Sequence, residues 1–326
     1  MSNPVRLKTA IATYGHTAAL KDGRVQIPDV NLDLVEVTPI IAAFRRMVRN
    51  LEFDVCEMAP TTYMIARALG APYIALPVFV MRRFHHTGLV CRPDSGIRVP
   101  SDLHGKKVAV RAWSVTSGVW TRGILVNDYG LDSAKVTWVV DDEEHVTELR
   151  LPPNVMHAPQ GRSLRAMMAD GEIQAGLTGN AGIGREGSPQ GGWRAAPTPP
   201  EYYELFPDGV KLEAEWFRRT GIYPIHGLIV IKEQFLADHP WLAKSLFGGF
   251  VESKRLYLEQ LKSGSLNDTD DRKYREFMPI VGDDPLPYGV AANLPSIEAM
   301  ITYAVQQELM PKRLPIEKLF ANPEIS

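Results

Sequence analysis

Cysteine is scarce in this chain of 326 residues, which contains only Cys56 and Cys91. The two do not form a CxxC pair, so the sequence predicts neither a disulfide framework nor a zinc site. HxH and HExxH motifs are missing as well, and no carboxylate cluster has convincing metal-ligand spacing. These motifs therefore give no support for a bound metal, and whether the protein uses one is left open.

Long apolar runs and a surplus of charge of one sign are also missing. No segment approaches the roughly 18 consecutive apolar residues of a membrane-spanning helix. The N-terminal residues MSNPVRLKTAIATYGH lack the apolar core of a signal peptide, which predicts a cytoplasmic protein. The net charge is −2 and basic residues form no stripe, which argues against nucleic acid or anionic lipid as the main partner. Assembly with further copies of the chain is left open.

What is present is an alternation of strand-like and helix-like segments. Apolar and polar residues alternate at 32–37, apolar residues recur at helical spacing at 40–51, and a further short strand follows at 53–58. Thr61 as N-cap and Gly70 at the end bracket a short helix. The pattern restarts at Ser101, and this succession predicts an α/β protein with parallel strands.

The length and the restart together predict two lobes. The first is expected to be discontinuous, comprising residues 1–90 and 228–326, and the second to comprise 91–227, with crossover segments near 86–92 and 221–229. Residues 180–200, rich in Gly and Pro, are predicted to form a long loop. The carboxyl ends of the strands would then face a ligand cleft between the lobes.

A short basic cluster interrupts apolar, strand-like sequence in PVFVMRRFHHTGLV at 77–90. Arg82, Arg83, His85 and His86 stand there around Phe84. In an extended strand, residues 82, 84 and 86 share one face and residues 83 and 85 the other. The cluster is either a solvated loop or a site for an anionic ligand.

Several stretches of the chain, in order and nearly end to end, resemble the 4,5-dihydroxyphthalate decarboxylase family. They are DGRV at 22–25, EFDVCEMAPTTYMIARALG at 52–70, PVFVMRRFHH at 77–86, TSGVWTRGIL at 116–125, TGIYPIHG at 220–227 and PYGVAAN at 287–293. SDLHGKKVAV at 101–110 resembles the corresponding phrase of type II periplasmic-binding-protein folds. The chain departs from the family at His85, where arginine is usual, and at His226-Gly227, where Met-His is common.

The resemblance implies a two-lobed type II periplasmic-binding-protein-like fold and the decarboxylation of a hydroxylated aromatic dicarboxylate without a cofactor. Such a site must hold carboxylates and supply a proton to the ring carbon that loses CO2. Arg82 is the candidate carboxylate clamp, because a guanidinium matches a carboxylate bidentately. His86 is the candidate general acid, with His85 as a second choice. Arg83 is expected to be structural.

Two predicted helix N-termini offer further anion sites. Thr61 and Thr62 directly follow a strand, and Ser114, Thr116 and Ser117 repeat this arrangement in the second lobe. Free N–H groups and hydroxyls at such positions bind anions. The alternative for these residues is simple helix capping.

The remaining candidates are single residues at expected strand ends. Glu57 could act as a base or orient a histidine, and Trp113 could stack on an aromatic ring or belong to the core. Tyr14 and His16 close the first strand, and His226 lies at the returning strand. We expect all of them on the ligand side.

The sequence leaves three functions open. The first is the decarboxylase, and the second is a non-catalytic solute-binding protein or sensor for a small aromatic carboxylate. A third is another lyase, or a dehydratase, that acts on a related anionic ring. Because function resides in the site and not in the fold, the side chains at the site must decide among them.

Overall fold

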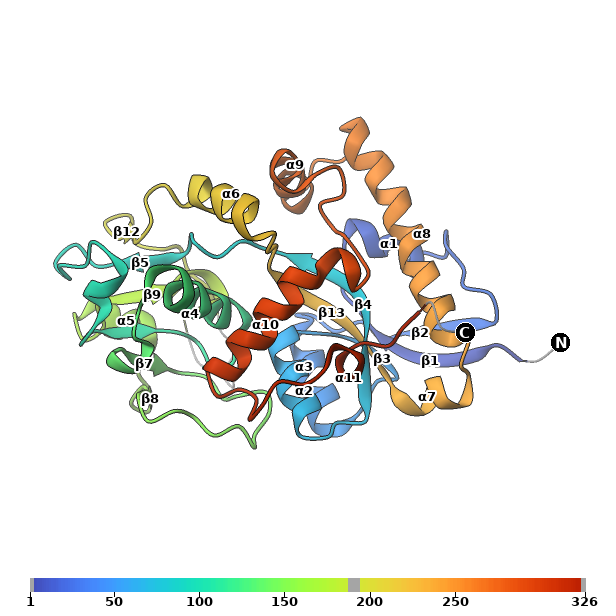
Figure 1. Cartoon of the computed structure of the whole chain (residues 1–326), viewed down its shortest axis with the longest axis horizontal. Coiled ribbons are helices and arrows are strands. Elements are labelled where there is room, and N and C mark those ends of the chain that lie inside the picture. The colour runs from blue at the N-terminus through green and yellow to red at the C-terminus, as the bar shows by residue number, and fades with distance from the viewer. Residues whose placement is uncertain (1–2, 187–193, 324–326) are drawn as a thin grey trace. The chain divides into compact units, whose positions relative to one another are not determined.

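The computed structural model describes residues 3–186 and 194–323, which form two compact units (Figure 1). The first unit comprises residues 1–83, 217–301 and 312–326, and the second comprises 84–216 and 302–311. The sequence predicted the lobe limits at 90/91 and 227/228, whereas the units divide at 83/84 and 216/217. Residues 302–311, predicted in the first lobe, belong to the second unit.

The first unit is built on a five-stranded sheet in the order β2-β1-β3-β13-β4. Its strands are β1 (Val5–Ala10), β2 (Val30–Leu34), β3 (Val55–Met58), β4 (Tyr73–Arg82) and β13 (Ile225–Lys232). β1 pairs in parallel with β2 and β3, whereas β13 runs antiparallel between β3 and β4. The predicted α/β class is confirmed.

Helices cover this sheet. They are α1 (Gly15–Lys21), α2 (Ile41–Asn50), α3 (Pro60–Ala68), α7 (Glu233–Asp238), α8 (Leu242–Ser263) and α11 (Ile316–Leu319). A further helix, α9 (Thr269–Val281), packs against α8. α1 and α8 lie side by side (Figure 1) and bury one apolar cluster with Val55, Val80 and Ile229 of the sheet. The side chains that follow at two-residue steps in β3 and β4, Glu57 and Arg82, therefore face the side of α1 and α8.

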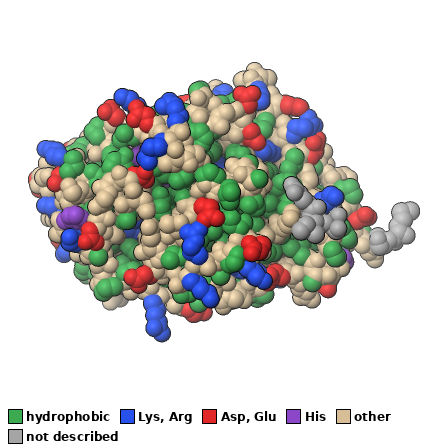
Figure 2. Space-filling model, in the orientation of Figure 1, with side chains coloured by type: hydrophobic (Ala, Val, Ile, Leu, Met, Phe, Trp, Pro, Cys, Tyr) green, Lys and Arg blue, Asp and Glu red, His purple; other side chains and the backbone are tan. Residues whose placement is uncertain are grey.

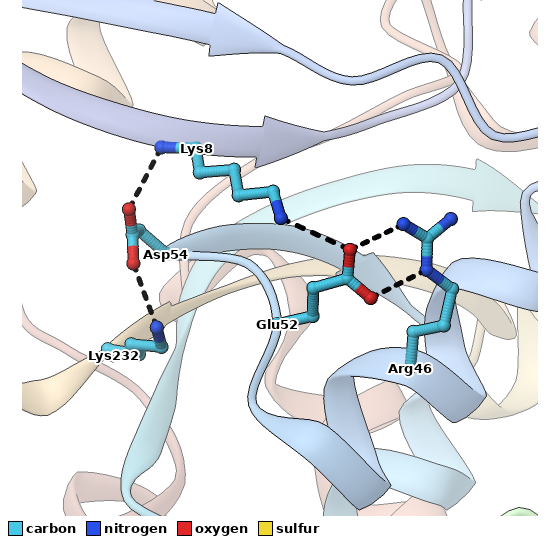
Figure 3. A network of polar contacts seen from close by, with 5 residues as sticks. All are labelled: Lys8, Arg46, Glu52, Asp54 and Lys232. Carbon is cyan, nitrogen blue, oxygen red and sulfur yellow. Dashed lines mark hydrogen bonds and ion pairs between the residues drawn. The ribbon is translucent and has the colours of Figure 1, made fainter.

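An ionic network anchors the start of β3, at the end of the strand remote from Glu57 (Figure 3). Asp54 accepts hydrogen bonds from the Lys8 backbone N–H (2.9 Å) and from Nζ of Lys232 (2.8 Å). Glu52 binds Nζ of Lys8 at 3.1 Å and Nε of Arg46 at 2.7 Å, and these partners lower the pKa of Glu52 to about 2. The network ties β1, α2 and β13 to the segment that enters β3.

The second unit contains a six-stranded sheet in the order β12-β5-β9-β6-β7-β8. The strands are β5 (Leu89–Cys91), β6 (Lys107–Ala109), β7 (Thr137–Val140), β8 (Val155–His157), β9 (Ala175–Leu177) and β12 (Tyr203–Glu204). β9, β6, β7 and β8 are parallel, while β5 pairs antiparallel with β9 and β12. The carboxyl ends of β6 and β7 consequently meet at one edge.

The other elements of this unit are helical or short. They are α4 (Thr116–Tyr129), α5 (Leu164–Ala169) and the pair β10 (Arg185–Glu186) and β11 (Arg194–Ala195). The pair interrupts the loop predicted at 180–200, of which 187–193 lie outside the described residues. α6 (Gly209–Thr220) and α10 (Leu294–Gln306) each begin in one unit and end in the other.

The strand register predicted for the basic cluster is wrong. β4 ends at Arg82, and the next strand, β5, begins only at Leu89. Pairing with β13 becomes irregular between Ile225 and Ile229, so the ladder that would extend β4 is lost. Arg82 and Arg83 belong to the first unit and the chain from Phe84 onward to the second, so Arg82, Phe84 and His86 do not share a strand face.

The sequence predicted no basic stripe and no membrane-spanning helix, and the structure can be compared with both predictions. On the face shown in Figure 2, basic and acidic side chains of the described residues are interspersed. Among the helices of residues 3–186 and 194–323, none is long and apolar enough to span a bilayer.

Candidate active site

A buried carboxyl group, Glu57, lies near the end of β3 in the first unit. Its side chain is only 2% exposed. Tyr14, at the start of α1, donates its hydroxyl to Oε1 of Glu57 at 2.7 Å, and the Ala12 backbone N–H donates to Oε2 at 3.1 Å. Gly227 of β13 lies beside this carboxyl group, since a Cβ at this position would be in van der Waals contact with Oε1 at 3.5 Å. Three neighbouring strands thus contribute to one polar site at this edge.

The protonation of Glu57 is unusual. Burial raises its pKa to about 7, while the hydrogen bonds from Tyr14 and Ala12 and the charge of Lys21 act in the opposite direction. Burial and the adjacent Glu57 raise the pKa of Tyr14 far above its usual range, so Tyr14 keeps its proton and remains the donor. Near neutral pH, Glu57 can therefore both hold and release a proton.

His16 packs beside this pair but cannot act as a cation. Its ring is stacked on Tyr14, with centroids 5.3 Å apart and planes 6° apart, and meets the edge of Tyr257 at 5.8 Å. Burial lowers the pKa of His16 to about 3, although the Val80 carbonyl acts in the opposite direction. His16 is neutral at physiological pH, and its contacts orient the Tyr14 ring. The sequence predicted Tyr14, His16 and Glu57 at strand ends on the ligand side, and the structure brings the three side chains into contact.

The other candidates of the first unit lie around the same strand ends. Thr61 and Thr62 are buried in the first turn of α3, but the N-cap of this helix is Ala59, so the capping role predicted for Thr61 is wrong. Pro60 explains the shift, since proline favours the first helical position. His226 is half-buried in β13, directly before Gly227.

Arg82 is fully buried and its guanidinium is engaged by the protein itself. It donates to the carbonyl oxygens of Tyr223 (2.8 Å) and Pro287 (3.0 Å) and to the side-chain oxygen of Asn293, and it stacks on Phe79. Its pKa falls to about 10 through burial, so the group stays charged. These contacts do not support the role of a carboxylate clamp. Arg82 instead joins three family-like stretches, 77–86, 220–227 and 287–293.

His85 and His86 are buried in the second unit. The His86 ring lies among Tyr129, Phe206 and Trp216, with the last centroid at 5.3 Å, and its backbone N–H donates to Glu213 at 3.1 Å. The His85 ring is parallel to that of Trp120 at 6.5 Å. Aromatic side chains thus pack against both imidazole rings. The role of His86 as general acid stays a prediction.

The start of α4 holds the remaining candidates. Thr116 and Ser117 are buried in its first turn. Just before it, Trp113 and Ser114 bind the carboxylate of Glu144, which the sequence did not single out. Arg122, within the family-like stretch 116–125, was also missed. It is fully buried and lies 3.6 Å from the ring centroid of Trp113.

The described residues, 3–186 and 194–323, include no group of three or more His, Cys, Asp or Glu side chains placed to hold a metal ion. Cys56 and Cys91 are both buried and unbridged. In the first unit, Glu57 is the group suited to transfer a proton.

Comparison with known proteins connects this site to a family. Residues 34–182 match the family model described as "ABC transporter, phosphonate, periplasmic substrate-binding protein". The periplasmic aliphatic sulphonate binding protein SsuA from Escherichia coli has a similar structure, with a TM-score of 0.53 and 13% identity, covering 100% of this chain and 94% of that one. The predicted periplasmic-binding-protein-like fold is thus confirmed.

Two curated relatives carry the same name. A 4,5-dihydroxyphthalate decarboxylase of Comamonas testosteroni is 31% identical over 329 residues, covering 97% of this chain and 96% of the relative. A 4,5-dihydroxyphthalate decarboxylase of Pseudomonas putida is 36% identical over 181 residues, covering 53% of this chain and 70% of the relative. The expected enzyme class, a carboxy-lyase, agrees with both names. The end-to-end match to the Comamonas relative shows that the chain belongs to the 4,5-dihydroxyphthalate decarboxylase family.

Proposed function

We propose that the protein decarboxylates a hydroxylated aromatic dicarboxylate of the 4,5-dihydroxyphthalate type, with Glu57 as the proton donor. The observation that carries the proposal is the buried Glu57–Tyr14 pair, whose hydrogen bond is 2.7 Å long. Membership in the family supplies the substrate class.

The chemistry requires one proton at one ring carbon. A ring hydroxyl para to a carboxylate pushes electron density to the carbon that bears this carboxylate, and an acid protonates that carbon. The bond to the carboxylate then breaks, its electron pair restores the aromatic ring, and CO2 leaves. A dihydroxyphthalate becomes a dihydroxybenzoate, with one proton consumed, and neither an oxidant nor a reductant is needed.

Glu57 suits this step. A general acid works best when its pKa lies near the working pH, because it is then largely protonated yet releases the proton readily. Burial raises the pKa of Glu57 to about 7, which meets this condition. Tyr14 holds the carboxyl in place and donates to it in either protonation state.

Binding without turnover is the second candidate. The match of residues 34–182 to a family of substrate-binding proteins favours it. Under this alternative Glu57 would serve only to bind or stabilise.

A substrate panel separates the two functions. Purified protein is incubated with 4,5-dihydroxyphthalate, 4-hydroxyphthalate and phthalate, and CO2 and the aromatic product are quantified. We expect CO2 from the hydroxylated compounds and none from phthalate, which lacks the electron-donating group. If the protein binds all three compounds but releases CO2 from none, it is a binding protein and the proposed decarboxylase activity is refuted.

A further inference from the structure

Glu144 occupies an edge of the second unit where α/β proteins bind ligands. It lies in the loop that follows β7, next to the segment that leads from β6 into α4. β6 and β7 are parallel neighbours, so both segments leave the sheet at the same edge. The carboxyl ends of parallel strands are the usual ligand side of such sheets.

Trp113 and Ser114 both donate hydrogen bonds to this carboxylate. The Trp113 backbone N–H donates to Oε1 at 2.6 Å, the Ser114 backbone N–H donates to Oε2 at 3.1 Å, and the Ser114 hydroxyl also donates to Oε2. Each oxygen thus has a backbone donor of its own, which is the arrangement that any carboxylate would use. Glu144 reaches the donors from a different loop and is only partly buried.

A buried cation lies behind the same helix turn. Arg122 is 0% exposed and uses Nε for Gln307 and Nη2 for the Trp113 carbonyl, whereas Nη1 has no hydrogen-bond partner among the described residues. Helical side chains point toward the N-terminus, and Nη1 lies 3.0 Å from the position that a Cβ of Gly118 would take, in the first turn of α4. Burial lowers the pKa of Arg122 to about 9, and the negative charge of Glu144 opposes this fall.

We propose that the Trp113 and Ser114 donors, backed by Arg122, form a carboxylate-binding site, and that Glu144 is its internal competitor. A ligand carboxylate binds by displacing Glu144, which swings out with its loop. The exchange replaces one carboxylate by another, so no buried donor loses its partner. The identity of the ligand, an aromatic dicarboxylate, rests on the proposed function, whereas the existence of the site does not.

A purely structural role for Glu144 makes the opposite prediction. If the carboxylate is a permanent cap of the loop before α4, its neutralisation only destabilises the second unit, and added carboxylates bind no better. If it is a competitor, its neutralisation opens the site.

The test uses phthalate, which has the carboxylates but no ring hydroxyl. Its affinity is measured by titration calorimetry, at one pH and one salt concentration, for the wild type, Glu144→Gln and Glu143→Gln. Glu143 is the exposed neighbour of Glu144 in the chain, so its substitution removes the same charge one position away from the proposed competitor. We expect Glu144→Gln to bind phthalate about tenfold more tightly, which corresponds to a site open about a tenth of the time in the wild type. Glu143→Gln should match the wild type.

Two further variants complete the design. Glu144→Asp keeps the charge but shortens the side chain, and it should also tighten binding, which covers the case that Glu144→Gln does not fold. Ser114→Ala, combined with Glu144→Gln, should weaken phthalate binding about fivefold because one donor is lost.

Equal phthalate affinities of Glu144→Gln, Glu144→Asp and the wild type would overturn the proposal, as would a lack of binding by all of them. Because no CO2 is measured, these results are independent of the decarboxylase test. A protein that fails to decarboxylate could still pass this one.

Discussion

Replacing Glu57 with glutamine should change how the stability of the protein depends on pH. The pKa of Glu57 is about 7 in the folded chain, against a usual value of 4.5. Between these pH values the unfolded chain releases the proton while the folded chain retains it, so rising pH favours unfolding. At about 1.4 kcal/mol per pH unit, the wild type should lose about 3 kcal/mol of unfolding free energy between pH 4.5 and 7 on account of Glu57.

Glutamine cannot titrate, so Glu57→Gln should lack this loss. It gives up one of the two hydrogen bonds that Glu57 accepts, a penalty of about 1 kcal/mol that does not vary with pH. Urea unfolding of both proteins at several pH values gives the difference in unfolding free energy, in which the other titrating groups cancel. The wild type should have the larger unfolding free energy at pH 4.5, and this advantage should shrink or reverse by pH 7. A difference that stays constant over this range would refute the raised pKa and the assignment of Glu57 as an acid.

Three further predictions concern neighbouring or competing residues. Tyr14→Phe removes a hydrogen bond that lowers the pKa of Glu57, so the fall of kcat with rising pH should move up by about one pH unit; an unchanged pH profile would separate Tyr14 from the acid. Arg82→Ala should lower the unfolding free energy by about 3 kcal/mol or more, because the hydrogen bonds to Tyr223, Pro287 and Asn293 are lost. Arg83→Ala, at an exposed side chain, should change it by less than about 0.5 kcal/mol. Thermal unfolding measures both, and a stable Arg82→Ala protein with only a raised KM would restore Arg82 as the carboxylate clamp. His86→Phe keeps the aromatic packing and should keep nearly full turnover, while a fall in kcat of about a hundredfold would identify His86 as the general acid.

Much of the fold follows from local patterns. The helical spacing at 40–51 predicted α2 closely, whereas the alternation at 32–37 located β2 only in part, because the strand spans Val30–Leu34. These elements depend on which residues are apolar within a few positions of one another. The predicted N-cap of α3, Thr61, lies two positions after the observed N-cap, Ala59, because Pro60 favours the first helical position.

The basic cluster shows where local patterns fail. Apolar, strand-like sequence flanks the cluster on both sides within 77–90. β4 nevertheless ends at Arg82, because its partner β13 becomes irregular near Gly227, far away in sequence. The acceptors of Arg82 are likewise remote, 141 positions away for Tyr223 and 205 for Pro287. A buried structural arginine and a surface or ligand-binding arginine have the same sequence signature.

The candidate site was predicted in part for the same reason. Tyr14, His16 and Glu57 were recognised because each follows or ends a strand, on the side where parallel strands bind ligands. That they touch one another depends on the pairing of β1 with β3 and on α1 folding back over Glu57. Glu144, 30 positions from Ser114, carried no signal beyond its charge.

The central claim is that Glu57 delivers the proton for decarboxylation, and single-turnover kinetics tests it most directly. Enzyme in excess over 4,5-dihydroxyphthalate is mixed rapidly near pH 6, and CO2 formation is followed for the wild type, Glu57→Gln and the control Glu52→Gln, whose carboxylate lies in the network at the opposite end of β3. We predict that Glu57→Gln slows the chemical step by about 10²–10⁴-fold while Glu52→Gln retains the wild-type rate. Equal rates for the wild type and Glu57→Gln would contradict the account.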